Sequence, residues 1–300
     1  MSIREPAAIG FYPLDPQETI EMIERSYLNT HGPKALPKVN ENGERKIVAG
    51  IVPHAGYAYS GPVAAHFYYE LAKDGKPESF ILLGPSHTGY PGIGIMTEGI
   101  WKTPLGEVPV DENLANIILE NCDIMLDAPE AHEGEHSLEV QLPFLQHLYN
   151  GKFAIVPIAI GMSDFESCQE VGIAIAKAIK NTNKDVVVIS STDMMHYGTY
   201  YGYTPAGVRL LEKVLEWIYQ TDRQIIERIK KLDGEGVINY VFDQGLTMCG
   251  FAPVAAMIEA IKNIGKVEAK VLKYETSYDI RGGDATAIVG YLAMAFYRTP

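Results

Sequence analysis

The fold is decided by KIVAGIVPHAGYAYSG (residues 46–61), in which an apolar run leads into a small polar loop that carries His54. Two segments repeat this pattern: SFILLGPSHTGY (79–90) carries His87, and VVVISSTDMMHYG (186–198) carries His196. Open α/β sheets bind ligands at the carboxyl ends of their strands. We therefore expect these histidines to converge on one cleft, where histidine suits both metal ligation and proton transfer.

Strand and helix patterns alternate along the chain, which predicts an α/β layer architecture. We expect a single domain over residues 1–300, with a central, mostly parallel or mixed β-sheet flanked by helices. Asp111 should cap one helix, and Ser137 should cap another that is bent near Pro143. Strands are expected at 46–52, 79–84, 153–160, 185–191, 267–276 and 286–296, and helices at 60–73, 112–121, 165–180, most of 205–243 and 251–263.

Composition excludes several classes of function. The chain has 300 residues, is 47% hydrophobic and carries a formal net charge of -13 with no basic run, so neither nucleic acid nor an anionic membrane is an expected partner. Its N-terminal residues contain no secretory signal, and its longest late apolar stretch (285–297) is shorter than the ~20 residues that span a bilayer. Three cysteines form no disulfide framework, which predicts a cytoplasmic protein, and a homo-oligomer remains open.

His54, His87 and Cys249 are the candidate metal ligands. The two histidines are 33 residues apart, about one strand–helix–strand unit, so neighbouring strands would present both rings at one sheet edge. Cys249, in LTMCGFAP (246–253), is a soft donor close to an expected helix start, which would favour its thiolate. The alternatives are two unrelated loop histidines and a small buried core cysteine.

Asp193, His196 and His136 are the candidate catalytic residues. Asp193 precedes His196 by three residues, so a helical turn would place both on one face, where the carboxylate would orient the ring for acid–base catalysis. The alternative is that Asp193 caps a helix on which His196 merely packs. His136 ends the charged loop EAHEGEHS (130–137), which is otherwise typical of a solvated surface.

Tyrosines follow the three strand-end histidines closely. Tyr57 and Tyr59 follow His54, Tyr90 follows His87, and Tyr197 follows His196. We expect Tyr57, Tyr59 and Tyr197 to bind substrate by stacking or through a hydroxyl hydrogen bond, although most of the 18 tyrosines must pack elsewhere.

Several of these segments together resemble the Memo family. The similar segments occur in family order and cover nearly the whole chain: REPAAIGFYP (4–13), PHAGYAYSG (53–61), LGPSHTGY (83–90), TPLG (103–106), EHSLEVQLPFLQ (135–146), SSTDMMHYG (190–198) and TMCG (247–250). The resemblance implies a fold similar to the catalytic subunits of class III extradiol dioxygenases, which are non-haem iron enzymes. It implies a metal site on His54, His87 and Cys249, in a cleft also lined by Asp193 and His196, with His136 nearby.

The resemblance also implies a departure from the dioxygenases, because Cys249 stands where their third ligand is a carboxylate. A thiolate is softer and shifts the metal preference towards copper or zinc as well as iron. We expect a mononuclear metal ion, with Fe(II) as the first choice and copper or zinc as alternatives. We expect redox or oxygen-linked activity on an unknown small molecule or peptide. Two alternatives remain: a non-catalytic protein that binds a peptide or partner or handles metal through the same cleft, and a zinc hydrolase in which Glu135 or Asp193 activates water.

Overall fold

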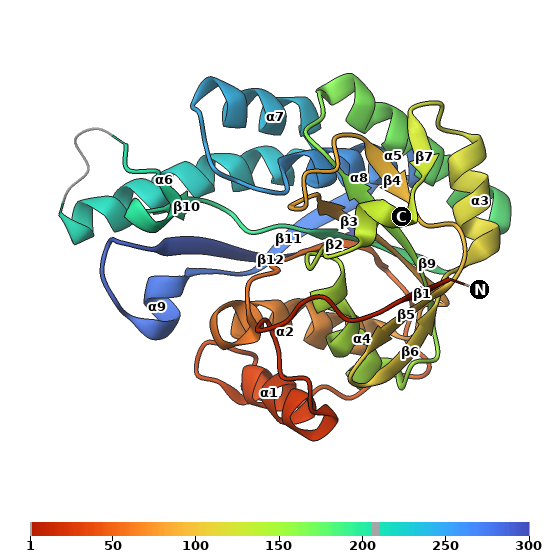
Figure 1. Cartoon of the computed structure of the whole chain (residues 1–300), viewed down its shortest axis with the longest axis horizontal. Coiled ribbons are helices and arrows are strands. Elements are labelled where there is room, and N and C mark those ends of the chain that lie inside the picture. The colour runs from red at the N-terminus through yellow and green to blue at the C-terminus, as the bar shows by residue number, and fades with distance from the viewer. Residues whose placement is uncertain (1, 206–209, 300) are drawn as a thin grey trace.

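A nine-stranded sheet forms the centre of the protein in this computed structural model, which describes residues 2–205 and 210–299 (Figure 1). Its strands follow the order β10-β12-β2-β9-β3-β8-β4-β7, and β11 pairs with β12. The four central strands are parallel, whereas β12 joins β2, and β4 joins β8, in antiparallel fashion. The strands are β2 (Ile47–Val52), β3 (Ser79–Pro85), β4 (Ile93–Ile95), β7 (Met125–Asp127), β8 (Ala154–Ile160), β9 (Val186–Ser191), β10 (His196–Tyr197), β11 (Val267–Thr276) and β12 (Ile288–Arg298).

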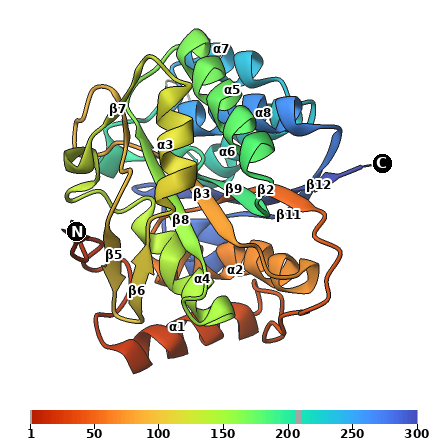
Figure 2. The same cartoon turned by 90° about the vertical axis from the view of Figure 1, so that its right-hand side faces the viewer.

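Helices cover both faces of this sheet (Figure 2). On one face α2 packs against β2 and β12 and is itself covered by α1 and α4; on the other, α8 packs against β2, β3 and β9 beneath α5 and α7. A small second sheet contains β1 (Ile3–Arg4), β5 (Ile100–Thr103) and β6 (Gly106–Pro109). The helices are α1 (Pro16–Leu28), α2 (Tyr57–Asp74), α3 (Glu112–Glu120), α4 (Leu142–Tyr149), α5 (Phe165–Thr182), α6 (Leu211–Lys230), α7 (Gly234–Asp243), α8 (Phe251–Ile264) and α9 (Ser277–Arg281).

The predicted α/β class, with a mixed sheet flanked by helices, is confirmed. Strands that are buried on both faces explain the continuous apolar runs, because helices cover both sides of a parallel sheet. Asp111 caps α3 as expected, its side chain accepting from the Leu114 N–H at 3.2 Å. None of the described helices is long and apolar enough to cross a lipid bilayer.

Two local predictions are corrected, and a third lies partly outside the described residues. Ser137 caps no helix, because its hydroxyl donates to the Pro85 carbonyl oxygen; a 3-10 turn at Glu139–Gln141 precedes α4, which starts beside Pro143. The helix expected at 60–73 begins three residues earlier, at Tyr57. Part of the helical stretch expected over 205–243 lies outside the described residues, and the rest forms α6 and α7.

The N-terminal segment is tied to the core through one buried carboxylate, that of Glu139. Its oxygens accept hydrogen bonds from the Ala7 and Ala8 N–H groups at 2.8 and 3.1 Å and from the Tyr12 hydroxyl, and Arg4 pairs with it. Both side chains of the ion pair are almost fully buried. This network fixes the segment that ends at Phe11, beside the histidines described next.

Candidate metal centre

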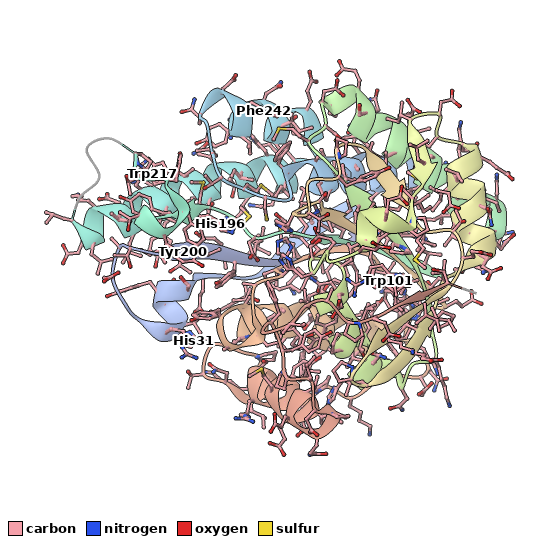
Figure 3. The ribbon with its side chains drawn as sticks, viewed as in Figure 1. His31, Trp101, His196, Tyr200, Trp217 and Phe242 are labelled. Carbon is pink, nitrogen blue, oxygen red and sulfur yellow. The ribbon has the colours of Figure 1, made fainter. Side chains whose placement is uncertain are left out.

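A cleft of about 610 Å³ opens beyond the carboxyl ends of β2, β3 and β9. These ends carry His54, His87 and Asp193 in the loops that follow the strands, as expected for a parallel sheet. Figure 3 places His196 and Tyr200 together, between α6 and β12. The polar and aromatic lining residues are Phe11, His54, Tyr59, His87, His136, Asp193, His196, Tyr200, Tyr201, Ser277 and Tyr291.

Three histidines gather in the cleft. One ring nitrogen from each of His54, His87 and His136 lies within 4.8 Å of the others. The ring centroids are 5.2 Å apart for His54–His87 and 4.6 Å for His87–His136. Phe11 stacks on His136 with its centroid at 4.1 Å. Neutral imidazoles at this spacing are suitable ligands for one transition-metal ion.

Hydrogen bonds fix the protonated nitrogen of His54. The Ser191 hydroxyl donates its proton to the Ser137 carbonyl oxygen at 2.6 Å and accepts from Gln141 Nε2 at 2.8 Å. Because that proton is already committed, His54 Nδ1, 3.0 Å from Ser191 Oγ, must be the donor in their contact. Nε2 of His54 is therefore left with a bare lone pair, the form in which a histidine binds metal.

Glu135 orients the His87 ring and lies beside His136. Its Oε1 lies 3.0 Å from His87 Nδ1 and 3.6 Å from His136 Nδ1, and its side chain is fully buried. Burial opposes ionisation of Glu135, but hydrogen bonds from the His87 ring and from the Ser137 and His87 N–H groups hold its pKa at about 2. An ionised Glu135 draws the His87 proton to Nδ1 and frees Nε2, a carboxylate–histidine arrangement common in metal centres.

The electrostatics of the cluster keep the rings of His54 and His136 neutral. Burial, reinforced by the neighbouring histidines, lowers the pKa of His54 well below its usual value. Burial and His87 lower the pKa of His136 to about 4. Both rings are consequently unprotonated at neutral pH and able to donate a lone pair to a cation.

Cys249 joins the cluster at His54 only. Its Sγ lies 3.2 Å from His54 Nε2, and since that nitrogen carries no proton, the thiol donates the hydrogen bond. The expected thiolate-favouring effect of the helix start is corrected: α8 begins two residues later, and removal of the sulfur from solvent, with Asp193 nearby, raises the pKa of the thiol. Cys249 is thus a protonated thiol until a cation lies beside it.

His196 also lines the cleft. Its Nδ1 lies 3.1 Å from the Met194 carbonyl oxygen and 3.0 Å from that of Thr247. Both partners only accept, so Nδ1 carries the proton and Nε2 is the free basic nitrogen. His196 is thereby fitted to take a proton from a molecule in the cleft.

Asp193 does not orient His196 in the predicted way. His196 lies in β10 rather than on a helical turn, and its ring is held by the two carbonyl oxygens. Asp193 instead accepts from the His54 N–H at 2.9 Å, and burial raises the pKa of its carboxyl group. It therefore fixes the loop that carries His54 and lines the cleft floor.

The tyrosines divide between cleft and core. Tyr59 lines the cleft and is 48% exposed. Tyr57 and Tyr197 are buried outside it: Tyr57 donates to the Val140 carbonyl oxygen at 2.5 Å, and Tyr197 packs beside Trp217. Their prediction as substrate-binding residues is corrected, because the earlier start of α2 and the pairing of β10 with β12 turn both rings inward.

Sequence reasoning missed several residues that shape this site. It did not identify Phe11, Ser191, Tyr200, Tyr201 or Tyr291 as site residues, and it treated His136 as a proton-transfer group rather than a ligand. Ser191 carried a visible signal, since it ends a buried strand two positions before Asp193. No local pattern marks Phe11, which reaches the cleft only through the buried Glu139 network.

A buried acid beneath β10 makes stability depend on pH. Burial raises the pKa of Asp222 to about 7, while its oxygens accept from the Tyr274 hydroxyl at 2.6 Å and the Met195 N–H at 3.2 Å. An unfolded Asp has a pKa of about 3.9. From about pH 4 to pH 7 the folded protein therefore holds a proton that the unfolded chain releases, so stability from this group is lost as pH rises.

We expect the free energy of unfolding to fall by about 2 kcal/mol more for wild type than for Asp222→Asn between about pH 5 and pH 7. Chemical denaturation at several pH values measures this difference. Asp243→Asn, at the exposed end of α7, should keep the wild-type pH dependence. Identical pH profiles for wild type and Asp222→Asn would contradict the assignment.

Comparisons with known proteins agree with this architecture. A MEMO1 family protein of Methanopyrus kandleri is 42% identical over 297 residues, covering 98% of this chain and 99% of its own. Another, of Methanocaldococcus jannaschii, is 43% identical and covers 96% of this chain and 97% of its own.

Among solved structures, an uncharacterized protein of Escherichia coli K12 has a similar fold, with a TM-score of 0.55 and 12% identity over 83% of this chain and 99% of its own. The family model described as Memo-like protein matches residues 4–295. The chain belongs to the Memo-like protein family.

Proposed function

We propose that this protein binds one transition-metal ion in the histidine cleft and uses it in redox or oxygen-linked chemistry. The observation that carries the proposal is that His54 and His87 are held in the same way. The Nδ1 atom of each ring is hydrogen-bonded to a buried oxygen, that of Ser191 or of Glu135. Both Nε2 lone pairs are left for a ligand, as in metal centres whose histidines are oriented by outer hydrogen bonds.

The proposed ligand set contains His54, His87 and Cys249, with His136 as a further nitrogen donor. The Cys249 sulfur lies next to His54, and His136 lies within 4.8 Å of both other histidines. Such a mixture of imidazole and thiolate donors is suitable for Fe(II), copper or zinc. When bound, iron or copper would supply the electron transfer on which oxygen-linked chemistry depends.

The remaining residues of the cleft would bind and deprotonate the substrate. The bare Nε2 of His196 is the proposed proton acceptor, because both carbonyl contacts of the ring hold its proton on Nδ1. Tyr59, Tyr201 and Tyr291 supply aromatic walls for a small molecule or a peptide side chain. This separation of metal ligands from a proton-accepting histidine resembles that of a class III extradiol dioxygenase, although a thiol replaces the carboxylate ligand.

The burial of Glu135 disfavours the zinc-hydrolase alternative. Its side chain is fully buried, and its two oxygens already accept three hydrogen bonds from His87 and Ser137, which disfavours a role in activating a cleft water. Asp193 lines the cleft but is committed to the His54 N–H. A binding or metal-handling role would use the same cleft without turnover.

All three cysteines are free thiols, which favours the reducing cytoplasm.

Cobalt(II) loading under anaerobic conditions tests the proposed centre. We expect about one Co(II) per chain and an absorption band from thiolate-to-metal charge transfer, because Cys249 would be a sulfur donor. In Cys249→Ser the band should disappear while cobalt still binds to the histidines. His31→Ala removes a histidine outside the cleft and should leave both the stoichiometry and the band unchanged.

Two results would contradict parts of the proposal. Failure of the wild-type protein to bind a stoichiometric amount of cobalt would eliminate the metal centre. Stoichiometric binding with no band at any pH would remove Cys249 from the ligand set and leave a three-histidine site.

A further inference from the structure

Arg281 borders a small pocket next to the cleft, beside the cleft residue Tyr59, and forms no ion pair with a carboxylate of the described residues. Its guanidinium carbon lies 5.4 Å from the ring centroid of Tyr59, which lines the cleft. Its guanidinium donates one weak hydrogen bond within the described chain, to the Ala58 carbonyl oxygen at 3.4 Å. From this position we infer that Arg281 selects cleft ligands that carry a carboxylate group.

The short helix α9 holds Arg281 in this place. Ser277 begins α9 and lines the cleft, and Arg281, four residues later, lies on the same side of the helix. A reciprocal pair of hydrogen bonds between Thr276 and Asp279 fixes the start of α9, and Gly282, with φ +69°, ends it. The short helix that carries Arg281 is therefore fixed at its start by the Thr276–Asp279 pair and ended by Gly282.

The nearest carboxylates in sequence do not neutralise Arg281. Asp279 accepts from the Tyr219 hydroxyl at 2.6 Å and from the Thr276 N–H at 2.7 Å. Asp284 accepts from the N–H and hydroxyl of Thr286 at 2.9 and 2.5 Å. Since Arg281 is exposed and these acids are committed elsewhere, the guanidinium donors that do not contact Ala58 are available to an anion from outside the chain.

The chemistry of the cleft indicates what that anion belongs to. The cleft walls are mostly aromatic or aliphatic, and no lysine or arginine is among their described lining residues. A guanidinium stacked on a tyrosine face presents a planar pair of donors that matches a carboxylate. The ligand class is therefore an aromatic or apolar body that enters the cleft and bears a carboxylate at its outer end.

This inference deepens the proposed function, since it takes the same cleft as the ligand site, but it can be tested without metal. The probes are 4-fluorobenzoate and its neutral counterpart 4-fluorobenzamide, titrated by fluorine NMR into the chelator-treated full-length chain. We expect the acid to bind about 5- to 10-fold more tightly than the amide, as a charge-assisted hydrogen bond provides. Arg281→Gln should remove this preference, and Arg281→Lys should retain part of it.

Arg25→Gln is the matched control. Arg25 borders the same small pocket as Arg281 but pairs with Glu21 at 3.4 Å, so its loss should leave the preference unchanged. Equal or undetectable binding of both probes, or a preference that survives Arg281→Gln, would overturn the inference. Tighter binding of phenyl phosphate than of benzoate would overturn the carboxylate assignment in favour of a phosphate group. None of these outcomes depends on whether the protein binds cobalt.

Discussion

Replacing Glu139 with alanine is expected to lower the free energy of unfolding by about 3–5 kcal/mol. The substitution leaves the Arg4 guanidinium buried without its counter-charge and removes the acceptor of the Ala7 and Ala8 N–H groups. Breaking one side of a buried ion pair is costly because the remaining charge is kept from water. Equilibrium denaturation in guanidinium chloride measures the loss.

Two variants make this prediction specific. Glu133→Gln changes an exposed acid of the neighbouring loop and should be within about 0.5 kcal/mol of wild type. Arg4→Met combined with Glu139→Ala should lose less stability than the two single changes added together, since the double variant leaves no unpaired charge. A loss below about 1 kcal/mol for Glu139→Ala would contradict the view that this carboxylate anchors the N-terminal segment.

The Glu139 network also explains why part of the site could not be predicted from the sequence. Strand ends are local features, so the apolar runs before His54, His87 and His196 were sufficient to place these histidines around one cleft. Phe11 reaches His136 only because a carboxylate 128 residues later in the chain holds the N-terminal segment in place. A contact of this kind has no periodicity or spacing that a single sequence displays.

The tyrosines show a second limit of sequence reasoning. Tyr57 and Tyr59 are two residues apart, and no sequence pattern distinguishes their roles. In α2, however, positions two apart point in different directions, so Tyr59 faces the cleft while Tyr57 packs in the core. Which of them lines the cleft depends on the residue at which α2 begins, and helix boundaries are the least certain part of a sequence-based prediction.

The charged loop before α4 shows a third limit. A run with three glutamates and two histidines is typically solvated, yet Glu135 and His132 are fully buried while Glu133 between them is exposed. Burial strengthens the interaction of Glu135 with the imidazoles beside it, because a carboxylate removed from water is less screened. The sequence therefore placed His136 near the cleft but could not show that Glu135 connects it with His87.

Replacing Glu135 with alanine is expected to weaken cobalt binding about 10- to 100-fold, as losses of outer partners do in other metal centres. The change removes the acceptor that keeps the His87 proton on Nδ1 and lies nearest to the His136 ring. The His87 ring would then lose its fixed orientation and could carry its proton on the nitrogen that binds the ion. Competition with a chelator of known affinity measures the loss, with His87→Ala marking the effect of removing a ligand outright.

Glu130→Gln is the matched control, since Glu130 belongs to the same loop but is exposed, and its cobalt affinity should equal that of wild type. Glu135→Gln should lie between the extremes, because an amide oxygen can still accept from the His87 ring while the amide NH₂ cannot accept from the His87 N–H. Unchanged affinity in a folded Glu135→Ala protein would mean that the carboxylate orients neither ring. The ordering Glu130→Gln, Glu135→Gln, Glu135→Ala, His87→Ala therefore separates orientation of a ligand from its loss.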